Sequence, residues 1–205
     1  MGFVGIMDFK GNNSKSVLSV VTSLGIEAKL IKSPDDILRS DRLIVPGVGH
    51  IDSVVREMDE LYLRDAIVDF SKSGNFLLGI CLGQHLLGNE SEESSKVRTL
   101  GILDFEVSKL PNNFEAGLRV PHVGWNSVYF NKDHALFHNI PSSSDFYFSH
   151  SYAITTNTVS NMASTEHSVW FTSVAGRDNI LSIQFHPEKS QKVGRQLLSN
   201  FCSFN

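Results

Sequence analysis

The sequence has little of what marks secreted, membrane-spanning or nucleic-acid-binding proteins. Its two cysteines, Cys81 and Cys202, are too few for a disulfide framework, which favours a reducing, cytoplasmic setting. No apolar run reaches the roughly 18 residues that a membrane span requires, and the opening MGFVGIMDFKG lacks the basic start and long apolar stretch of a signal peptide. The formal net charge of -4, with no long basic run, argues against nucleic acid or an anionic membrane as a partner.

What the chain does have is an alternation of strand-like and helix-like segments in its first half. With 205 residues, 41% of them hydrophobic, it is long and apolar enough for one globular domain over 1–205. We expect strands at 3–9, 27–31, 42–49 and 76–80, and helices at 14–25 and 52–73, the second capped by Asp52. This pattern predicts an α/β fold with a mostly parallel sheet between helices, and an active site at the carboxyl ends of the strands.

The second half is richer in Phe, Tyr, Val and Thr and has shorter turns. Strands are expected at 125–130, 146–154, 169–175 and 179–185, largely antiparallel and added to the same domain. The chain ends in an apolar helical pattern at 192–204, where Cys202 is expected to be a small buried hydrophobe.

One turn carries a chemical signal. Gly79-Ile80-Cys81-Leu82-Gly83 has the form Gly-x-Cys-x-Gly between an apolar strand and an expected helix, which is the pattern of a nucleophile elbow with sulfur in place of oxygen. The glycines allow a strained backbone, and the helix N-terminus favours a thiolate, so we expect an exposed, reactive thiol at Cys81. Taken alone, the pentapeptide also fits a glycine-rich turn with an incidental cysteine.

A second segment supplies a base for that thiol. His186 follows the apolar strand at 179–185, Pro187 stiffens the turn, and Glu188 could orient the imidazole, giving a nucleophile–base–orienter set. The glycine-rich stretch at 45–49 offers backbone N–H groups for an oxyanion hole, or is a simple strand end. The other histidines show no metal-ligand spacing, so we expect neither a metal nor another cofactor.

These segments together resemble class I glutamine amidotransferases, whose signature is a cysteine elbow followed far downstream by Phe-His-Pro-Glu. The segments DRLIVPGVG, VPHVGWN, FYFSHSY and FHPEKSQ are similar to those of the glutaminase subunits of imidazole glycerol phosphate synthases. The resemblance extends from Asp8 to the last helix. It implies a flavodoxin-like class I amidotransferase fold, with a mostly parallel central sheet, helices on both faces and added antiparallel strands in the second half.

The resemblance also implies a function. Cys81 would attack the side-chain amide of glutamine, and the glutamyl thioester would be hydrolysed to glutamate. Ammonia would pass through a channel to a (β/α)8-barrel cyclase, with which the chain would form a heterodimer. Together they would make imidazole glycerol phosphate and aminoimidazole carboxamide ribotide in histidine biosynthesis.

Site residues follow from the same resemblance, by position. The oxyanion hole would be formed by Gly47, Val48, Gly49 and Leu82. The glutamine pocket would be formed by Gln84, His85, His150, Ser151 and Tyr152. The cyclase would be met by Lys10, Asn13, Trp125 and Lys189.

Two departures from the family pattern keep alternatives open. His85 stands where the family has a substrate-binding Gln, with Gln84 one place early, and Lys10 stands where the family has a glycine in the opening loop. A glutaminase subunit serving a cyclase-like partner that aminates or amidinates a surface-polysaccharide sugar has nearly the same motifs. A stand-alone cysteine hydrolase or redox sensor, and a silent regulatory subunit, are further alternatives.

Overall fold

The computed structural model describes residues 2–94, 98–115, 117–130, 134–156, 158 and 160–203. Its main feature is a nine-stranded sheet with strand order β2-β1-β3-β4-β12-β11-β10-β7-β8. The strands of this sheet are β1 (Val4–Met7), β2 (Ala28–Ile31), β3 (Arg42–Gly47), β4 (Phe76–Cys81), β7 (His122–Phe130), β8 (Ser144–His150), β10 (Asn161–His167), β11 (Val169–Arg177) and β12 (Ile180–Ile183).

The helices and a second, smaller sheet complete the described structure. The α-helices are α1 (Ser14–Ser23), α2 (Pro34–Arg39), α3 (Ile51–Glu60), α4 (Leu63–Lys72), α5 (Leu82–Leu87) and α6 (Gln191–Ser203), and the 3-10 helices are η1 (Ala135–Phe137) and η2 (Pro187–Lys189). The small sheet contains β5 (Glu90–Ser91), β6 (Glu106–Lys109) and β9 (Tyr152–Ala153).

The parallel half of the large sheet confirms the predicted fold class. Strands β2, β1, β3, β4 and β12 are parallel neighbours, which is the flavodoxin-like order for five parallel strands. Strands β11, β10, β7 and β8 continue the sheet with antiparallel pairing. Because β12 pairs with β4 and places Ile183 opposite Ile80, the segments that follow these two strands meet at one rim.

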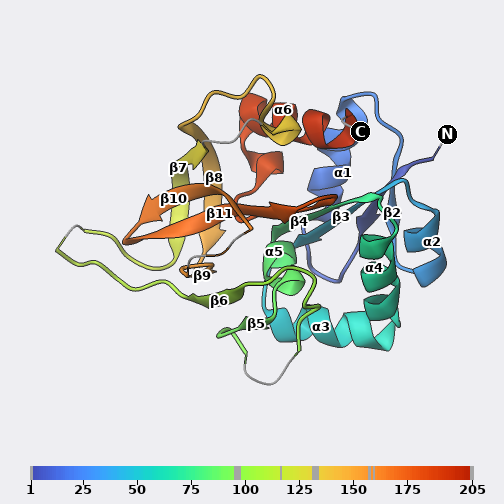
Figure 1. The fold of residues 1–205 in the computed structure, drawn as a ribbon, viewed down its shortest axis with the longest axis horizontal. Helices are drawn as coiled ribbons and strands as arrows, with labels where there is room; N and C mark the ends of the chain where they lie inside the picture. The colour runs from blue at the N-terminus through green and yellow to red at the C-terminus, as the bar shows by residue number, and fades with distance from the viewer. Residues whose placement is uncertain are drawn as a thin grey trace.

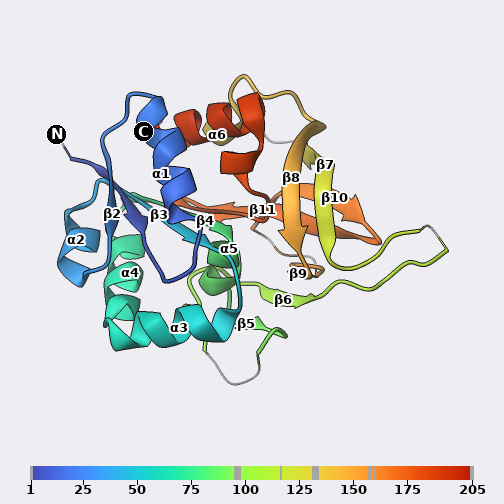
Figure 2. The ribbon, with the colours of Figure 1, turned by 180° about the vertical axis from the view of Figure 1, so that it is seen from behind.

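Helices cover the two faces of the sheet and enclose two cores. Figure 1 shows α1 and α6 on one face and α3, α4 and α5 on the other, and Figure 2 shows the same layers from behind. In β4, Ile80 packs into the core on the α1/α6 side, whereas Leu77 packs into the core under α3 and α4. The strand is apolar throughout because both of its faces are covered, as the sequence predicts.

Three expected elements were wrong in detail. The helix expected at 52–73 is two helices, because Tyr62 adopts a left-handed backbone (φ 56°) that an α-helix cannot continue. Asp52 does not cap α3; instead its N–H donates to Nδ1 of His50, at 3.3 Å. The strand expected at 146–154 is divided between β8 and β9, which belong to different sheets. In the half expected to be largely antiparallel, β12 is antiparallel to β11 but parallel to β4.

Other described elements were not predicted. Helix α2 begins with Ser33, whose hydroxyl accepts the N–H of Asp36, followed by Pro34. These are ordinary start signals, but the helix is too short to show apolar periodicity. Strand β10 has the mostly polar or small sequence NMASTEH, so it lacks the composition of a strand.

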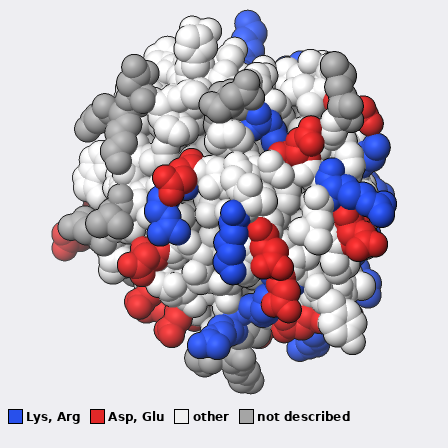
Figure 3. All heavy atoms as spheres, turned by 45° about the vertical axis from the view of Figure 1, so that its right-hand side comes forward, with Lys and Arg blue, Asp and Glu red and all other residues white. Residues whose placement is uncertain are grey.

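The distribution of surface charge and the length of the helices are consistent with the small net charge and the lack of long apolar runs in the sequence. On the face shown in Figure 3, acidic and basic side chains are interspersed rather than gathered by sign. Among the helices of the described ranges, none combines the length and the apolar character needed to cross a membrane.

Candidate active site

Cys81 lies at the end of β4, where α5 begins, in a strained backbone conformation with φ 55° and ψ -109°. The turn needs its glycines, because a Cβ on Gly83 would lie 1.8 Å from the carbonyl oxygen of Val45, and one on Gly79 would lie 2.6 Å from that of Gly83. The residue is only 6% exposed, so the expectation of an exposed thiol was wrong. It reaches solvent through a cavity of about 700 Å³ that it helps to line.

His186 follows β12 and is brought to Cys81 by the pairing of β12 with β4. Its Nδ1 lies 2.8 Å from Oε1 of Glu188, and both side chains are almost fully buried. Nε2 is therefore the ring nitrogen left for the hydrogen bond with Cys81. Burial lowers the pKa of His186, but Cys81 and Glu188 outweigh burial and raise the pKa to about 10. The structure thus brings the three predicted catalytic residues together, with the imidazole in its protonated form at neutral pH.

Asn13 also belongs to this cluster. Its Nδ2 donates to Oε1 of Glu188 and lies 3.5 Å from Nδ1 of His186. We expected Asn13 to face a partner, but the structure places its amide on the carboxylate. The opening loop is held by Glu57, whose carboxylate accepts the N–H of Lys10 at 2.7 Å. The Lys10 side chain is exposed, so it remains accessible to a partner, whereas the Asn13 amide is bonded to Glu188.

Most of the expected pocket and oxyanion residues line the cavity at Cys81. These are Val48, Gly49, Leu82, His85, His150, Ser151 and Tyr152. Gly47 lies beneath them, where a Cβ would be 2.8 Å from that of Leu82. Gln84 was expected at the substrate and does not line the cavity; it is fully buried and donates to Oγ of Ser182 at 3.2 Å. A larger hollow of about 1210 Å³, beside α4, β5 and β6, contains neither cysteine.

Two groups near the cavity were missed from the sequence. Glu93 lines it, and burial raises the pKa of this carboxyl group. Nδ1 of His122 lies 3.0 Å from Nε2 of His150, whose Nδ1 lies 2.9 Å from the carbonyl oxygen of Tyr152. Burial lowers the pKa of His122 to about 3 and that of His150 well below its usual value, so both rings are neutral. No residue pattern in the sequence singled out Glu93 or the His122–His150 contact.

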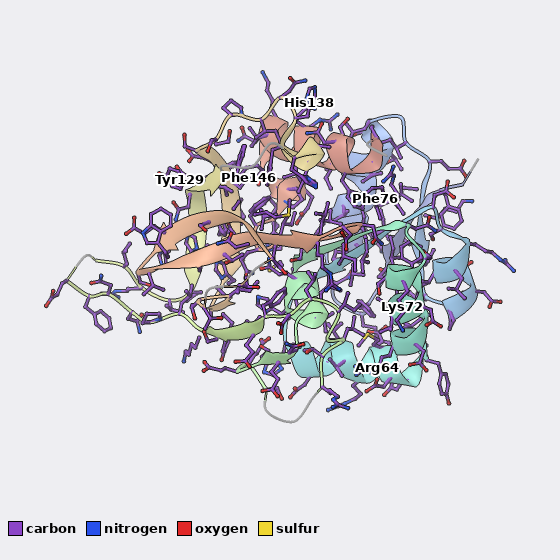
Figure 4. All side chains as sticks on the ribbon, viewed as in Figure 1. Arg64, Lys72, Phe76, Tyr129, His138 and Phe146 are labelled. Atoms are coloured by element: carbon purple, nitrogen blue, oxygen red, sulfur yellow. The ribbon has the colours of Figure 1, made fainter. Side chains whose placement is uncertain are left out.

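Exposed aromatic residues lie on the antiparallel end of the sheet. Trp125 is 48% exposed and makes an edge contact with Tyr147, over whose ring Nζ of Lys189 lies at 5.5 Å. Lys189 also lines the cavity, so this aromatic group adjoins the mouth of the site. Tyr129 projects from β7 at the outer edge of the molecule, while Phe146 from β8 points inward (Figure 4), and Tyr129 contacts Trp170.

A metal-binding site would require several ligating side chains close together in the part of the chain that the structure describes. There, no group of three or more His, Cys, Asp or Glu side chains is arranged to hold a metal ion. The site consists of a thiol, an imidazole and a carboxylate, which is the set required for nucleophilic acyl transfer.

Comparison with known proteins supports that interpretation of the site. The model of the family "Glutamine amidotransferase class-I" matches residues 5–203. The curated protein "Imidazole glycerol phosphate synthase subunit HisH" of Escherichia coli (strain K12) is 40% identical over 198 residues, covering 97% of each chain. The protein of the same name from Buchnera aphidicola is 39% identical over 199 residues, covering 97% of this chain and 98% of its own.

Solved structures show the same fold. A structure titled "Crystal structure of glutamine amidotransferase" has a TM-score of 0.75 at 20% identity and covers 98% of this chain and 99% of its own. The structure of PurLQS from Thermotoga maritima has a TM-score of 0.72 at 14% identity and covers 98% of this chain and 98% of its own.

Proposed function

This chain belongs to the class-I glutamine amidotransferase family, and we propose that it is the glutaminase subunit of an imidazole glycerol phosphate synthase. The observation that carries this proposal is nearly full-length similarity, at 38–40% identity, to curated proteins of that name. The contact of Cys81 with His186, and of His186 with Glu188, supports it because the same residues supply the chemistry that glutamine hydrolysis needs.

In the proposed reaction, the Cys81 thiolate attacks the side-chain carbonyl carbon of glutamine. Backbone N–H groups of Val48, Gly49 and Leu82, which line the cavity beside the sulfur, are the candidate donors to the oxyanion. The protonated His186 gives its proton to the amide nitrogen as the C–N bond breaks, so that the nitrogen leaves as ammonia. The neutral imidazole then takes a proton from the water that hydrolyses the thioester. Glu188 stabilises the imidazolium and holds the ring, so that Nε2 faces the sulfur.

Glutamine also needs partners for its charged end. Glu93 is the acidic side chain in the cavity lining that is free of the triad, and it suits the α-amino group of the substrate. Tyr152 and Ser151 line the same cavity, and we assign them to the substrate as well. Gln84 is left out because its side chain is bonded to Ser182.

The ammonia acceptor would be made on a separate cyclase subunit. The exposed Trp125 and Lys189 adjoin the mouth of the cavity, so a partner seated there would cover the route by which ammonia leaves. We assign this surface to a (β/α)8-barrel cyclase in a heterodimer, in the cytoplasm. The chain as a whole would act as one glutaminase domain, since the large sheet contains strands from both of its halves.

The decisive experiment replaces Cys81 with Ala in the complex with a histidine-pathway cyclase. Glutamine-dependent synthesis of imidazole glycerol phosphate is expected to be lost, while synthesis from free ammonium is retained because it uses only the partner. Loss of both activities would contradict the proposal. Glutamate release by the wild-type chain, measured with and without the cyclase, separates a partner-stimulated glutaminase from a stand-alone hydrolase and from a silent subunit.

A further inference from the structure

Three polar side chains alternate along β12 and the residues that follow it, and each contacts the elbow segment. Ser182 accepts from Gln84, Gln184 contacts both His85 and Cys81, and His186 contacts Cys81. These contacts lie on the face of the sheet that α5 covers. The intervening Ile183 and Phe185 face the opposite core, as the two-residue period of a strand requires.

The middle contact touches the nucleophile. Nε2 of Gln184 lies 3.9 Å from Sγ of Cys81, and Oε1 of Gln184 lies 2.9 Å from Nε2 of His85. Gln184 is fully buried, and its backbone N–H donates to the carbonyl oxygen of Ser173 at 2.9 Å. The proposed mechanism gives this glutamine no task, although its amide is one of the few polar groups that reach the sulfur.

Which end of the amide faces the sulfur depends on His85. An amide whose oxygen accepts from His85 presents an N–H to Sγ, whereas the flipped amide would present its carbonyl oxygen and would oppose a thiolate. Burial lowers the pKa of His85 to about 4, so the ring is neutral and carries a single N–H. The position of that one proton therefore selects the orientation of Gln184.

The surroundings of His85 place the proton on Nε2. Nδ1 is buried, and no acceptor lies within hydrogen-bonding geometry of it in the described ranges. The Tyr152 carbonyl is the backbone acceptor that interacts with the ring, but it lies outside hydrogen-bond geometry for Nδ1 and is aligned instead with the N–H of His150. A proton on Nδ1 would be a buried donor without a well-placed acceptor, which is unfavourable, whereas a proton on Nε2 is bonded to Oε1 of Gln184.

We propose that His85 and Gln184 are positioning residues, and that His85 orients the Gln184 amide so that one of its N–H groups points at the Cys81 sulfur and stabilises the thiolate. His85 thus acts on the nucleophile through Gln184, in addition to lining the cavity. The inference rests on the proposed function only in taking Cys81 as the nucleophile.

The test measures the reactivity of Cys81 without any substrate. In a Cys202→Ser background, the rate of alkylation by iodoacetamide is followed from pH 4 to pH 10, because only the thiolate reacts. Gln184→Met, which has no donor, is expected to raise the alkylation midpoint by about half to one pH unit, equivalent to roughly three- to tenfold slower alkylation below the midpoint. His85→Leu should raise it as well, since the amide is then free to flip.

Two further variants separate the orienting effect of His85 on Gln184 from a general loosening of the core. His85→Gln should stay near the wild-type midpoint, because its amide can donate to Oε1 of Gln184. Ser182→Ala is the matched control: it removes a buried hydroxyl two residues before Gln184, on the same face, that contacts the elbow helix but not the sulfur. Its midpoint should not move.

The proposal is overturned if Gln184→Met leaves the midpoint unchanged, if His85→Leu does so, or if Ser182→Ala shifts it equally. Should Gln184→Met fail to fold, the isosteric Gln184→Glu keeps an acceptor for His85 and removes the donor, and an unchanged or lower midpoint then overturns the proposal. Glutamate release on the same samples separates the two conclusions: shifted midpoints without glutaminase activity refute the proposed function alone, and glutaminase activity with unmoved midpoints refutes this inference alone.

Discussion

The raised pKa of His186 makes Glu188→Gln the most informative substitution in the triad. The change keeps the shape of the side chain and removes its charge. The two groups lie 2.8 Å apart and are almost fully buried, so solvent screens their interaction little. A buried hydrogen bond between charged partners contributes about 1.5–3 kcal/mol, and about 1.4 kcal/mol corresponds to one pKa unit. The pKa of His186 should therefore fall from about 10 by roughly one to two units.

The assay is an NMR titration of the histidine rings, with Cys81→Ala as a second background. Cys81 also raises the pKa of His186, so the double variant should titrate lower than either single variant. Glutaminase activity in the complex should fall roughly 10²- to 10⁴-fold, as expected when an orienting carboxylate is neutralised. A His186 midpoint unchanged by Glu188→Gln would refute this account of the triad.

The same shift predicts how stability depends on pH. The pKa of His186 in the folded chain is raised from its ordinary 6.5 to about 10, so the contribution of the pair is fully present below pH 6.5 and is lost as pH rises through 10. Glu188→Gln should therefore lower the melting temperature most at pH 6, with a difference that shrinks toward pH 10. A difference that grows with pH would contradict this reasoning.

Two other predictions concern the elbow and the substrate. Gly83→Ala should lower the free energy of unfolding, measured in urea, by about 3 kcal/mol or more, because the new Cβ would lie 1.8 Å from the carbonyl oxygen of Val45. Gly25→Ala is the control, since its Cβ would meet nothing within 4 Å and only the backbone strain at φ +80° remains. Equal effects of the two changes would refute the packing argument. Glu93→Gln should raise KM for glutamine about tenfold or more with little change in kcat, whereas Glu92→Gln, outside the cavity lining, should not; a fall in kcat alone would remove Glu93 from the substrate.

The sequence was sufficient for those parts of the fold and site that depend on local pattern. The apolar residues of the strands expected at 42–49 and 76–80 predicted a mostly parallel, covered sheet, and the glycines on both sides of Cys81 predicted the elbow. The association of His186 with Cys81 followed from the rule that strand ends share one rim of a parallel sheet. The structure adds the observation that β12, from the end of the chain, is the strand beside β4.

Side-chain direction was beyond what these patterns specify. In α5, neighbouring residues differ by about 100° around the helix axis, so Gln84 points at Ser182 while His85 reaches Gln184 and the cavity. A sequence motif gives the positions of both residues and the orientation of neither. The contact of Asn13 with Glu188 was not predicted for a similar reason, because the loop that precedes α1 folds back onto Glu188 across a large separation in sequence.

The site depends above all on the register between β12 and β4. Because strand side chains alternate between faces, a slip of one residue would turn Ile183 and Phe185 toward the elbow and bury His186 in the opposite core. The register is held by those same apolar residues, which are fully buried in the α1/α6 core, where Phe185 packs against Phe146 with 4.1 Å between ring centroids. The hydrophobic half of the segment Ser-Ile-Gln-Phe-His therefore fixes the position of the polar half, and packing on one face of the sheet sets the geometry of the chemistry on the other.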